Sequence, residues 1–129
     1  MVRVFVFAAM VTMAIVVACG GSNDGGGDQP ETTEYKLAVI NADGYVAPDD
    51  PIVAQFRQVL ADLDGKCPDT AEQIGDYAVS ANKMLNDKGV SETQLETMQY
   101  VRTSVAGLEV VNESCVGAFV LWVTGRTAQ

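Results

Sequence analysis

The side chains with the most distinctive chemistry in this sequence are its three cysteines, Cys19, Cys67 and Cys115. A cysteine sulfur can carry a covalent modification, join a disulfide or bind a metal, and its surroundings decide among these. The chain contains no histidine, so it lacks the most common general base and the most common metal ligand. Each cysteine is therefore assigned from its sequence context and from the compartment that this context implies.

Cys19 follows a segment with the features of an export signal. Arg3 places one positive charge in front of an apolar run from Val4 to Val17, which only Thr12 interrupts. A run of about 14 residues suits the apolar region of a signal peptide, whereas a membrane-spanning helix needs roughly 20. A signal peptide is therefore predicted. An uncleaved anchor and an ordinary secretory signal with an incidental cysteine are the alternatives.

Residues 16–19, Val-Val-Ala-Cys, resemble the lipobox of bacterial lipoproteins. The resemblance implies a diacylglycerol on the thiol of Cys19, cleavage before that residue and, usually, acylation of the new amine. Two or more acyl chains hold a protein durably on a bilayer, whereas one chain anchors it only marginally. Gly20 follows the cysteine in place of an aspartate. By the same resemblance, this implies the outer membrane, facing the periplasm, in a Gram-negative cell, and otherwise the outer face of the plasma membrane.

The chain that remains after such cleavage is strongly acidic. Removing residues 1–18 takes away Arg3 and leaves 111 residues with 7 basic and 17 acidic side chains, a net charge of about −10. Nucleic acid is not expected as a partner, because phosphate binding requires a basic surface. The same charge disfavours lying flat on anionic lipid and is typical of a protein kept soluble by its surface.

A polar linker separates the first cysteine from the rest of the chain. Residues 20–34, GGSNDGGGDQPETTE, contain no apolar side chain and so cannot be buried in a core. We predict a flexible tether with a root-mean-square reach of roughly 20 Å. The predicted organisation is a signal peptide over 1–18, the lipidated cysteine and its tether over 19–34, and one helical domain over 35–129.

With Cys19 lipidated, two cysteines remain, Cys67 and Cys115, and an even number can pair without leaving a free thiol. Export to an oxidising compartment makes a disulfide between them the expected state. The bridge would close a loop of 49 residues, 67 through 115, and contribute on the order of 4 kcal/mol in the loop-entropy model. It would join the junction between the first two predicted helices to the last one.

Helical signals begin near residue 50 and recur almost to the end of the chain. Asp50 and Pro51 suit the N-cap and N1 positions of a first helix, which runs to Gly65. A second helix is predicted to start near Asp69, the first residue of a D-x-x-E variant of the capping box. Gly89 suits the C′ position at its end.

Two further helices complete the predicted set. The third starts at the S-x-x-Q capping box of Ser91 and Gln94 and runs to Gly107, and the last extends from Leu108 to Val123. Short connections favour antiparallel packing of consecutive helices. The expected fold class is all-α, a small four-helix bundle with one disulfide.

The alternative fold is a small α+β domain. Residues 35–40, YKLAVI, and residues 116–123, VGAFVLWV, are apolar and compatible with a strand as well as with a helix. As strands, the two segments would pair in a short two-stranded sheet.

No arrangement of side chains in this sequence predicts catalysis or metal binding. Asn41, Asp43 and Asp50 fall at positions 3, 5 and 12 of an EF-hand-like loop, but Val39 stands at position 1 and offers no ligand atom. The carboxylate pairs Asp49/Asp50 and Asp62/Asp64 lie at predicted helix ends, where solvent-exposed helix capping accounts for their presence. No phosphate-binding loop, Cys-x-x-Cys pair or nucleophile elbow is present. We therefore expect no enzyme activity, no metal and no cofactor.

The apolar run from Cys115 to Val123 is the segment in which we look for function. Cys115, Phe119 and Trp122 share one helical face, which is enough for a helix at the edge of a bundle. The remaining large apolar side chains are then a surplus: Val116, Val120, Leu121 and Val123. We expect this helix to run through the centre of the bundle, and the alternative is an exposed interaction surface.

These features favour a small lipid-anchored interaction module of the cell envelope that binds another envelope protein or itself. The predicted anchor, the tether and the lack of catalytic groups all agree with that role. The alternative is a carrier or sensor for a small ligand, with a pocket between helices. Such a pocket would be lined by Met84, Met98, Tyr77, Tyr100 and Trp122.

Overall fold

The computed structural model describes residues 30–108 and 113–129, and its regular structure within these ranges is entirely helical. Five helices follow one another along the chain: α1 (Thr33–Ala42), α2 (Pro51–Asp64), α3 (Ala71–Asp87), α4 (Gln94–Ala106) and α5 (Val116–Thr127). The predicted all-α class is confirmed. The expected number of four helices is wrong, because the segment before residue 43 forms α1.

The two-stranded alternative is also wrong for the part of the chain that the structure describes. Residues 35–40 lie inside α1 and residues 116–123 lie inside α5. The predictions for the signal peptide, for the lipid on Cys19 and for most of the tether fall on residues 1–29, outside the described residues. Helix α1 begins at Thr33, two positions before the predicted start of the domain at residue 35.

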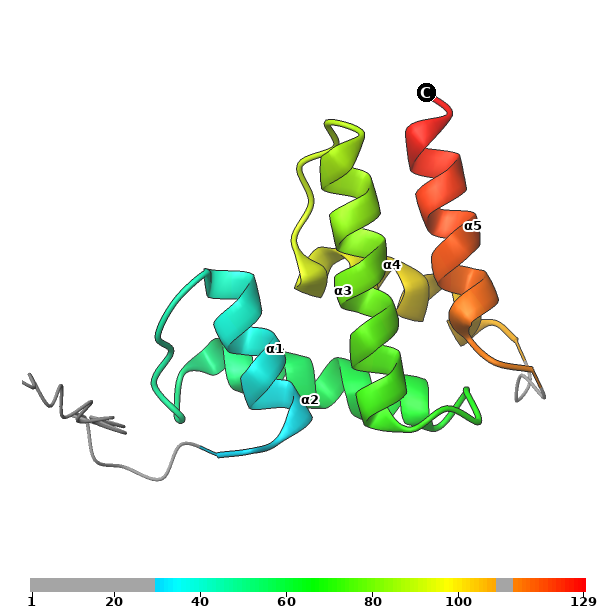
Figure 1. Cartoon of the computed structure of the whole chain (residues 1–129). Helices are drawn as coiled ribbons and strands as arrows, with labels where there is room; N and C mark the ends of the chain where they lie inside the picture. The colour runs from blue at the N-terminus through cyan, green and yellow to red at the C-terminus, as the bar shows by residue number, and fades with distance from the viewer. Residues whose placement is uncertain (1–29, 109–112) are drawn as a thin grey trace, which may run out of the picture.

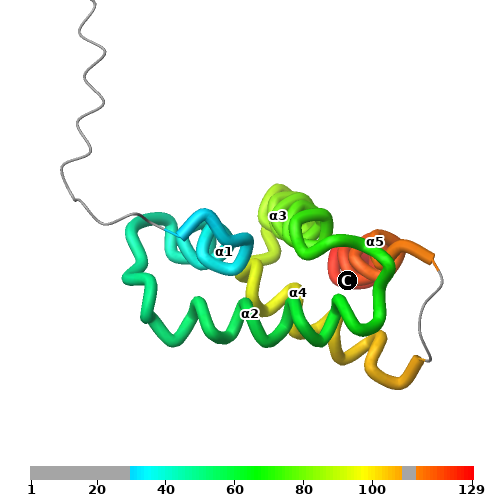
Figure 2. The backbone as a smooth tube through the Cα atoms, turned by 90° about the horizontal axis from the view of Figure 1, so that it is seen from below, coloured from blue at the N-terminus to red at the C-terminus, as the bar shows by residue number. Residues whose placement is uncertain are grey.

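The helices cross one another instead of alternating up and down. Helices α3 and α5 stand side by side and point the same way, while α4 crosses behind them (Figure 1). Seen from below, α3 and α5 are viewed nearly end-on and α2 runs across the picture (Figure 2). Helix α1 packs on α2 and α3, at the opposite end of the molecule from α5. The antiparallel arrangement expected for consecutive helices is therefore wrong.

Helix α2 begins as the sequence predicts. The carboxylate of Asp50 accepts a hydrogen bond from the backbone N–H of Ile52 (2.9 Å), and Pro51 occupies the first helical position. The buried face of α2 consists of Val53, Phe56, Val59, Leu60 and Leu63. Their spacing is that of one face of an amphipathic helix.

The predicted caps of the next two helices are wrong by one and two residues. Thr70 with Gln73 forms the capping box of α3, and Thr93 with Glu96 forms that of α4. Asp69 is consequently free for another role. Helices α3 and α4 therefore begin one and two residues later than predicted. Gly89 follows α3 with a φ of +79°, the left-handed conformation expected at C′.

One hydrophobic core joins all five helices. Its largest fully buried side chains include Phe56, Leu63, Ile74, Met98 and Phe119. Helix α1 contributes Tyr35, Leu37 and Ala38. The predicted disulfide between Cys67 and Cys115 is present, with the two Cα atoms 5.6 Å apart. None of the helices in the described ranges is both long enough and apolar enough to cross a membrane.

Candidate functional site

Helix α5 lies at the edge of the molecule and packs only through one face, against α3 and α4. Phe119 is its single fully buried residue, while Ala118, Trp122 and Val123 are partly buried against the core. The expectation that this helix runs through the centre of the bundle is therefore wrong. Helix α1 explains the difference, because it supplies apolar side chains that close the core on the far side of α3.

Three of the four surplus apolar residues of α5 face away from the core. The exposed fractions are 41% for Val116, 55% for Val120 and 74% for Leu121, whereas Val123 packs partly against the core. We call Val116, Val120 and Leu121 the α5 outer face. No charged side chain occurs between Val116 and Gly125. The outer face is therefore apolar and uncharged in a chain whose net charge is −9.

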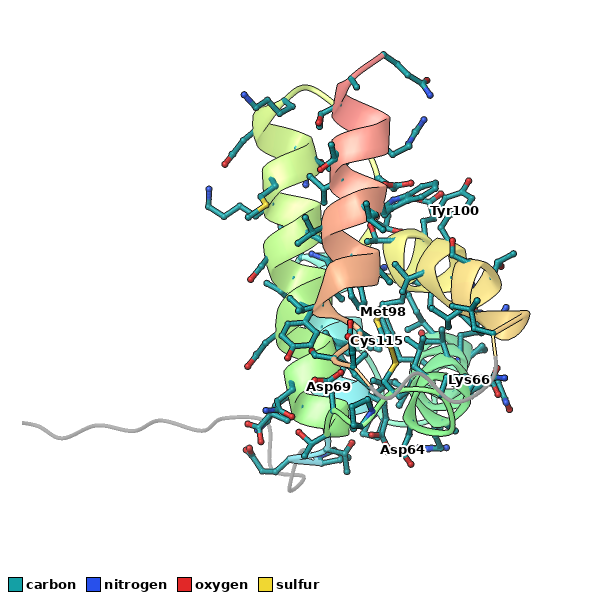
Figure 3. The ribbon with its side chains drawn as sticks, turned by 90° about the vertical axis from the view of Figure 1, so that its right-hand side faces the viewer. Asp64, Lys66, Asp69, Met98, Tyr100 and Cys115 are labelled. Atoms are coloured by element: carbon teal, nitrogen blue, oxygen red, sulfur yellow. A yellow bond between two sulfur atoms is a disulfide. The ribbon has the colours of Figure 1, made fainter. Side chains whose placement is uncertain are left out.

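A buried carboxylate holds the N-terminal end of α5. Asp69 Oδ2 accepts a hydrogen bond from the backbone N–H of Cys115 (2.7 Å), and its Oδ1 accepts from Ser114 Oγ (2.8 Å) and from the Tyr77 hydroxyl (3.1 Å). Figure 3 shows Asp69 beside Cys115 at the start of this helix. A negative charge at a helix N-terminus also interacts favourably with the helix dipole.

The hydrogen bonds determine the charge state of Asp69. Burial alone would raise the pKa of this carboxyl group, because a buried charge loses its hydration. The donors from Cys115, Ser114 and Tyr77 stabilise the ionised form and more than offset burial, so the pKa is lowered from its ordinary value. Asp69 is therefore a carboxylate at neutral pH, and it acts as a hydrogen-bond acceptor and not as a proton donor.

Cys67, Asp69 and Cys115 form a compact cluster that resembles a set of metal ligands. One ligand atom from each lies within 4.8 Å of the others. The two sulfur atoms are bonded to each other, and the carboxylate already accepts three hydrogen bonds. The cluster is thus a covalent and hydrogen-bonded link between the α2–α3 connection and the start of α5.

A second buried carboxylate holds α5 near its C-terminal end. Glu92, in the connection between α3 and α4, accepts a hydrogen bond from Trp122 Nε1 (3.0 Å), and its other carboxylate oxygen lies 3.9 Å from Arg126 Nε. Arg126 also lies over the ring of Trp122, 5.6 Å from the ring centroid. Tyr100 of α4 stacks on the same indole, with the ring centroids 4.4 Å apart.

The residues proposed to line a small-ligand pocket lie in different surroundings. Met98 is fully buried, Met84 is exposed on α3, and Tyr77 bonds to Asp69. Tyr100 and Trp122 stack on each other. The depressions among the described residues include one of about 330 Å³ between α4 and α5, lined in part by Leu121 and Trp122. Another, of about 390 Å³, lies between α2 and α4 and is lined by none of the five residues.

The polar residues of the calcium-like spacing have structural roles. Asn41 Oδ1 accepts a hydrogen bond from the backbone N–H of Leu95 (3.1 Å), which ties α1 to the first turn of α4. Asp43 takes the left-handed conformation that ends α1, with a φ of 52°. Asp50 caps α2. Two of these three residues therefore use their side-chain oxygens in hydrogen bonds to the backbone.

The structure thus brings together two predicted elements, the disulfide and the apolar segment of α5, and adds Asp69 and Glu92, whose roles were not predicted. Both acids lie in connections shortly before a Thr-x-x-Gln or Thr-x-x-Glu capping box. Recognising that threonine as the cap would have freed each acid for a tertiary role. Comparisons with models of protein families, with curated proteins and with solved structures found no match.

Proposed function

We propose that this chain is a lipid-anchored protein of the bacterial cell envelope that docks a protein partner on the α5 outer face. The observation that carries the proposal is the exposure of Val116 and Val120, one turn apart on α5, and of Leu121, which points about 100° around the helix from Val120. Exposed apolar side chains gathered on one helix are typical of binding surfaces, because such a patch gains free energy when a partner covers it.

The way in which α5 is held supports a docking role. The disulfide and Asp69 fix its N-terminal end, and Glu92 fixes its C-terminal half through Trp122. A surface that is already ordered loses little conformational entropy when a partner binds, so more of the contact energy appears as affinity. These links fix a helix that contributes only one fully buried side chain to the core.

The anchor is tested at Cys19. Cys19→Ser is expected to leave the chain as an uncleaved precursor or a soluble export product, because the thiol that would accept the lipid is absent. Mass spectrometry of the wild-type chain should show a protein that begins at a lipid-modified Cys19. Cys67→Ser serves as the control and should retain the lipid. A wild-type chain with an intact Met1 or an unmodified Cys19 would show that the anchor is absent.

The docking face is tested by photocrosslinking in the native envelope. A photoreactive amino acid at Leu121 is expected to give a covalent adduct with a protein, whereas the same amino acid at Tyr45 is not. The two positions are matched in exposure, at 74% and 75%, but Tyr45 lies in the connection between α1 and α2. Combining Val120→Asp with the photoreactive amino acid at position 121 should abolish the adduct. Equal adducts at both positions, or none at 121, would contradict the proposal.

A further inference from the structure

We infer that the partner of the α5 outer face is a second copy of this chain, in a two-fold symmetric dimer. The inference rests on the proposed function, since it names the partner of the same surface. In a two-fold dimer, one patch meets the identical patch of the other copy, so the patch has to be complementary to itself. An apolar and uncharged helix face meets this requirement without any matching of opposite charges.

The charges of the molecule are unevenly divided along the chain. Residues 30–93 carry 12 acidic and 5 basic side chains, whereas residues 94–129 carry three acidic and two basic side chains. The acidic part therefore consists of α1, α2, α3 and their connections, and the nearly neutral part consists of α4 and α5. A partner with a basic surface would be attracted to the acidic part and not to the α5 outer face.

The position of α5 determines how far apart the acidic parts of two associated copies would lie. Helix α1 and helix α5 lie at opposite ends of the molecule in both views (Figures 1 and 2). Two copies joined through α5 would hold their α1 ends far apart, beyond the roughly 8 Å over which charges interact at physiological salt. Copies that met through α3 or through the α1–α2 connection would bring net negative surfaces together, which is unfavourable, because α3 carries three acidic side chains and one basic side chain and residues 43–50 carry three acidic side chains and no basic one. Helix α5 carries no carboxylate, whereas each of the other four helices carries at least one, so a contact between copies through the α5 outer face avoids this repulsion.

The shape of α5 permits close contact between two such helices. Gly117 lies between the two exposed valines, and a Cβ added there would meet nothing within 4 Å. The neighbouring exposed positions Thr124 and Gly125 are also small. The helix has 12 residues. At 1.5 Å per residue it is about 18 Å long, so the contact is at the small end of specific interfaces. We therefore expect a weak dimer in solution that confinement to a membrane surface strengthens.

The inference is tested by sedimentation of the mature chain, residues 19–129, with Cys19→Ser to prevent lipidation. A concentration-dependent equilibrium between monomer and dimer is expected. Val120→Asp and Leu121→Lys should each weaken the dimer by about tenfold or more, because each places two like charges near the two-fold axis. Ile40→Asp, at an apolar position of α1 with 46% exposure, is the matched control and should leave the dimer unchanged.

Val120→Asp and Leu121→Lys introduce opposite charges. Together they distinguish a dimer contact through α5 from a general effect of the net charge of the chain on dimerisation. Leu121→Lys lowers the net negative charge, so a dimer limited only by overall repulsion would become tighter. Circular dichroism should show unchanged helix content in all three variants. A wild-type chain that stays monomeric at the highest attainable concentration overturns the inference, as does a dimer that neither α5 substitution weakens.

The outcome of photocrosslinking distinguishes this inference from the proposed function. An adduct at Leu121 with the mass of two chains supports both. An adduct with a different protein, together with a monomeric mature chain, overturns the second copy as partner and leaves the docking face in place.

Discussion

Replacing both Cys67 and Cys115 with alanine is expected to lower the free energy of unfolding by roughly 2–5 kcal/mol. The disulfide joins residues separated by 48 positions, so its loss releases a long loop in the unfolded chain. It also removes the cross-link between Cys67, in the α2–α3 connection, and Cys115, the N-cap of α5. Urea denaturation of the wild type and of the double variant, followed by circular dichroism, measures the difference.

The loss should be felt most strongly in α5. Phe119 is the one fully buried residue of this helix, so without the disulfide few interactions oppose its local opening. Hydrogen exchange is expected to accelerate in α5 more than in α2, whose buried face contains five residues. A reductant should reproduce the effect in the wild type and change nothing in the double variant. An unchanged denaturation midpoint would mean that the disulfide is not a main source of stability.

Asp69→Ala is expected to lower the free energy of unfolding by about 1–3 kcal/mol at neutral pH. The substitution leaves the backbone N–H of Cys115 and the Ser114 hydroxyl without their acceptor, and it removes the negative charge at the start of α5. Denaturation of the variant and of the wild type at the same pH measures the effect. Asp64→Ala is the control, since Asp64 is exposed at the end of α2.

The pH dependence of this difference follows from the lowered pKa of Asp69. The ordinary pKa is 3.8, which applies to the unfolded chain, and the folded pKa lies below it. A group with a lowered folded pKa contributes its full stabilisation above the unfolded pKa and loses it as the pH falls through the folded value. The gap between wild type and Asp69→Ala should therefore be constant near neutral pH and shrink in acid, below about pH 4. A gap that widens in acid would contradict this assignment.

These expectations share a physical basis. A helix with a single fully buried side chain gains little from the hydrophobic effect, so polar and covalent links at its two ends provide much of its attachment. Such links fix α5 without covering its outer face. If the same helix were held by a larger buried surface, fewer apolar side chains would be left for a partner.

Local signals in the sequence were sufficient for several features. The start of α2 at Asp50 and Pro51 was predicted, because the capping carboxylate and its donor are two residues apart. The end of α3 at Gly89 was predicted, because a left-handed residue favours glycine. The pairing of Cys67 with Cys115 followed from counting the cysteines once Cys19 was set aside. These features depend on neighbouring residues or on a small count.

Competition between nearby capping residues could not be resolved from the sequence. Asp69 and Thr70 are both good N-caps, and either one can begin α3. The structure uses Thr70, because the Asp69 carboxylate accepts hydrogen bonds from Ser114 and Cys115, which lie 45 and 46 positions away along the chain. Only the folded arrangement brings these donors to Asp69.

What the sequence by itself determined is the helical class, the cysteine pair and the surplus of apolar residues in 116–123. Whether that surplus is buried was decided only by the tertiary structure. Periodicity tells which side chains share a face of a helix, but it does not tell how many other elements compete to cover the core. Helix α1 supplies Tyr35 and Leu37 to that core, so α5 remains at the edge with Val120 and Leu121 exposed.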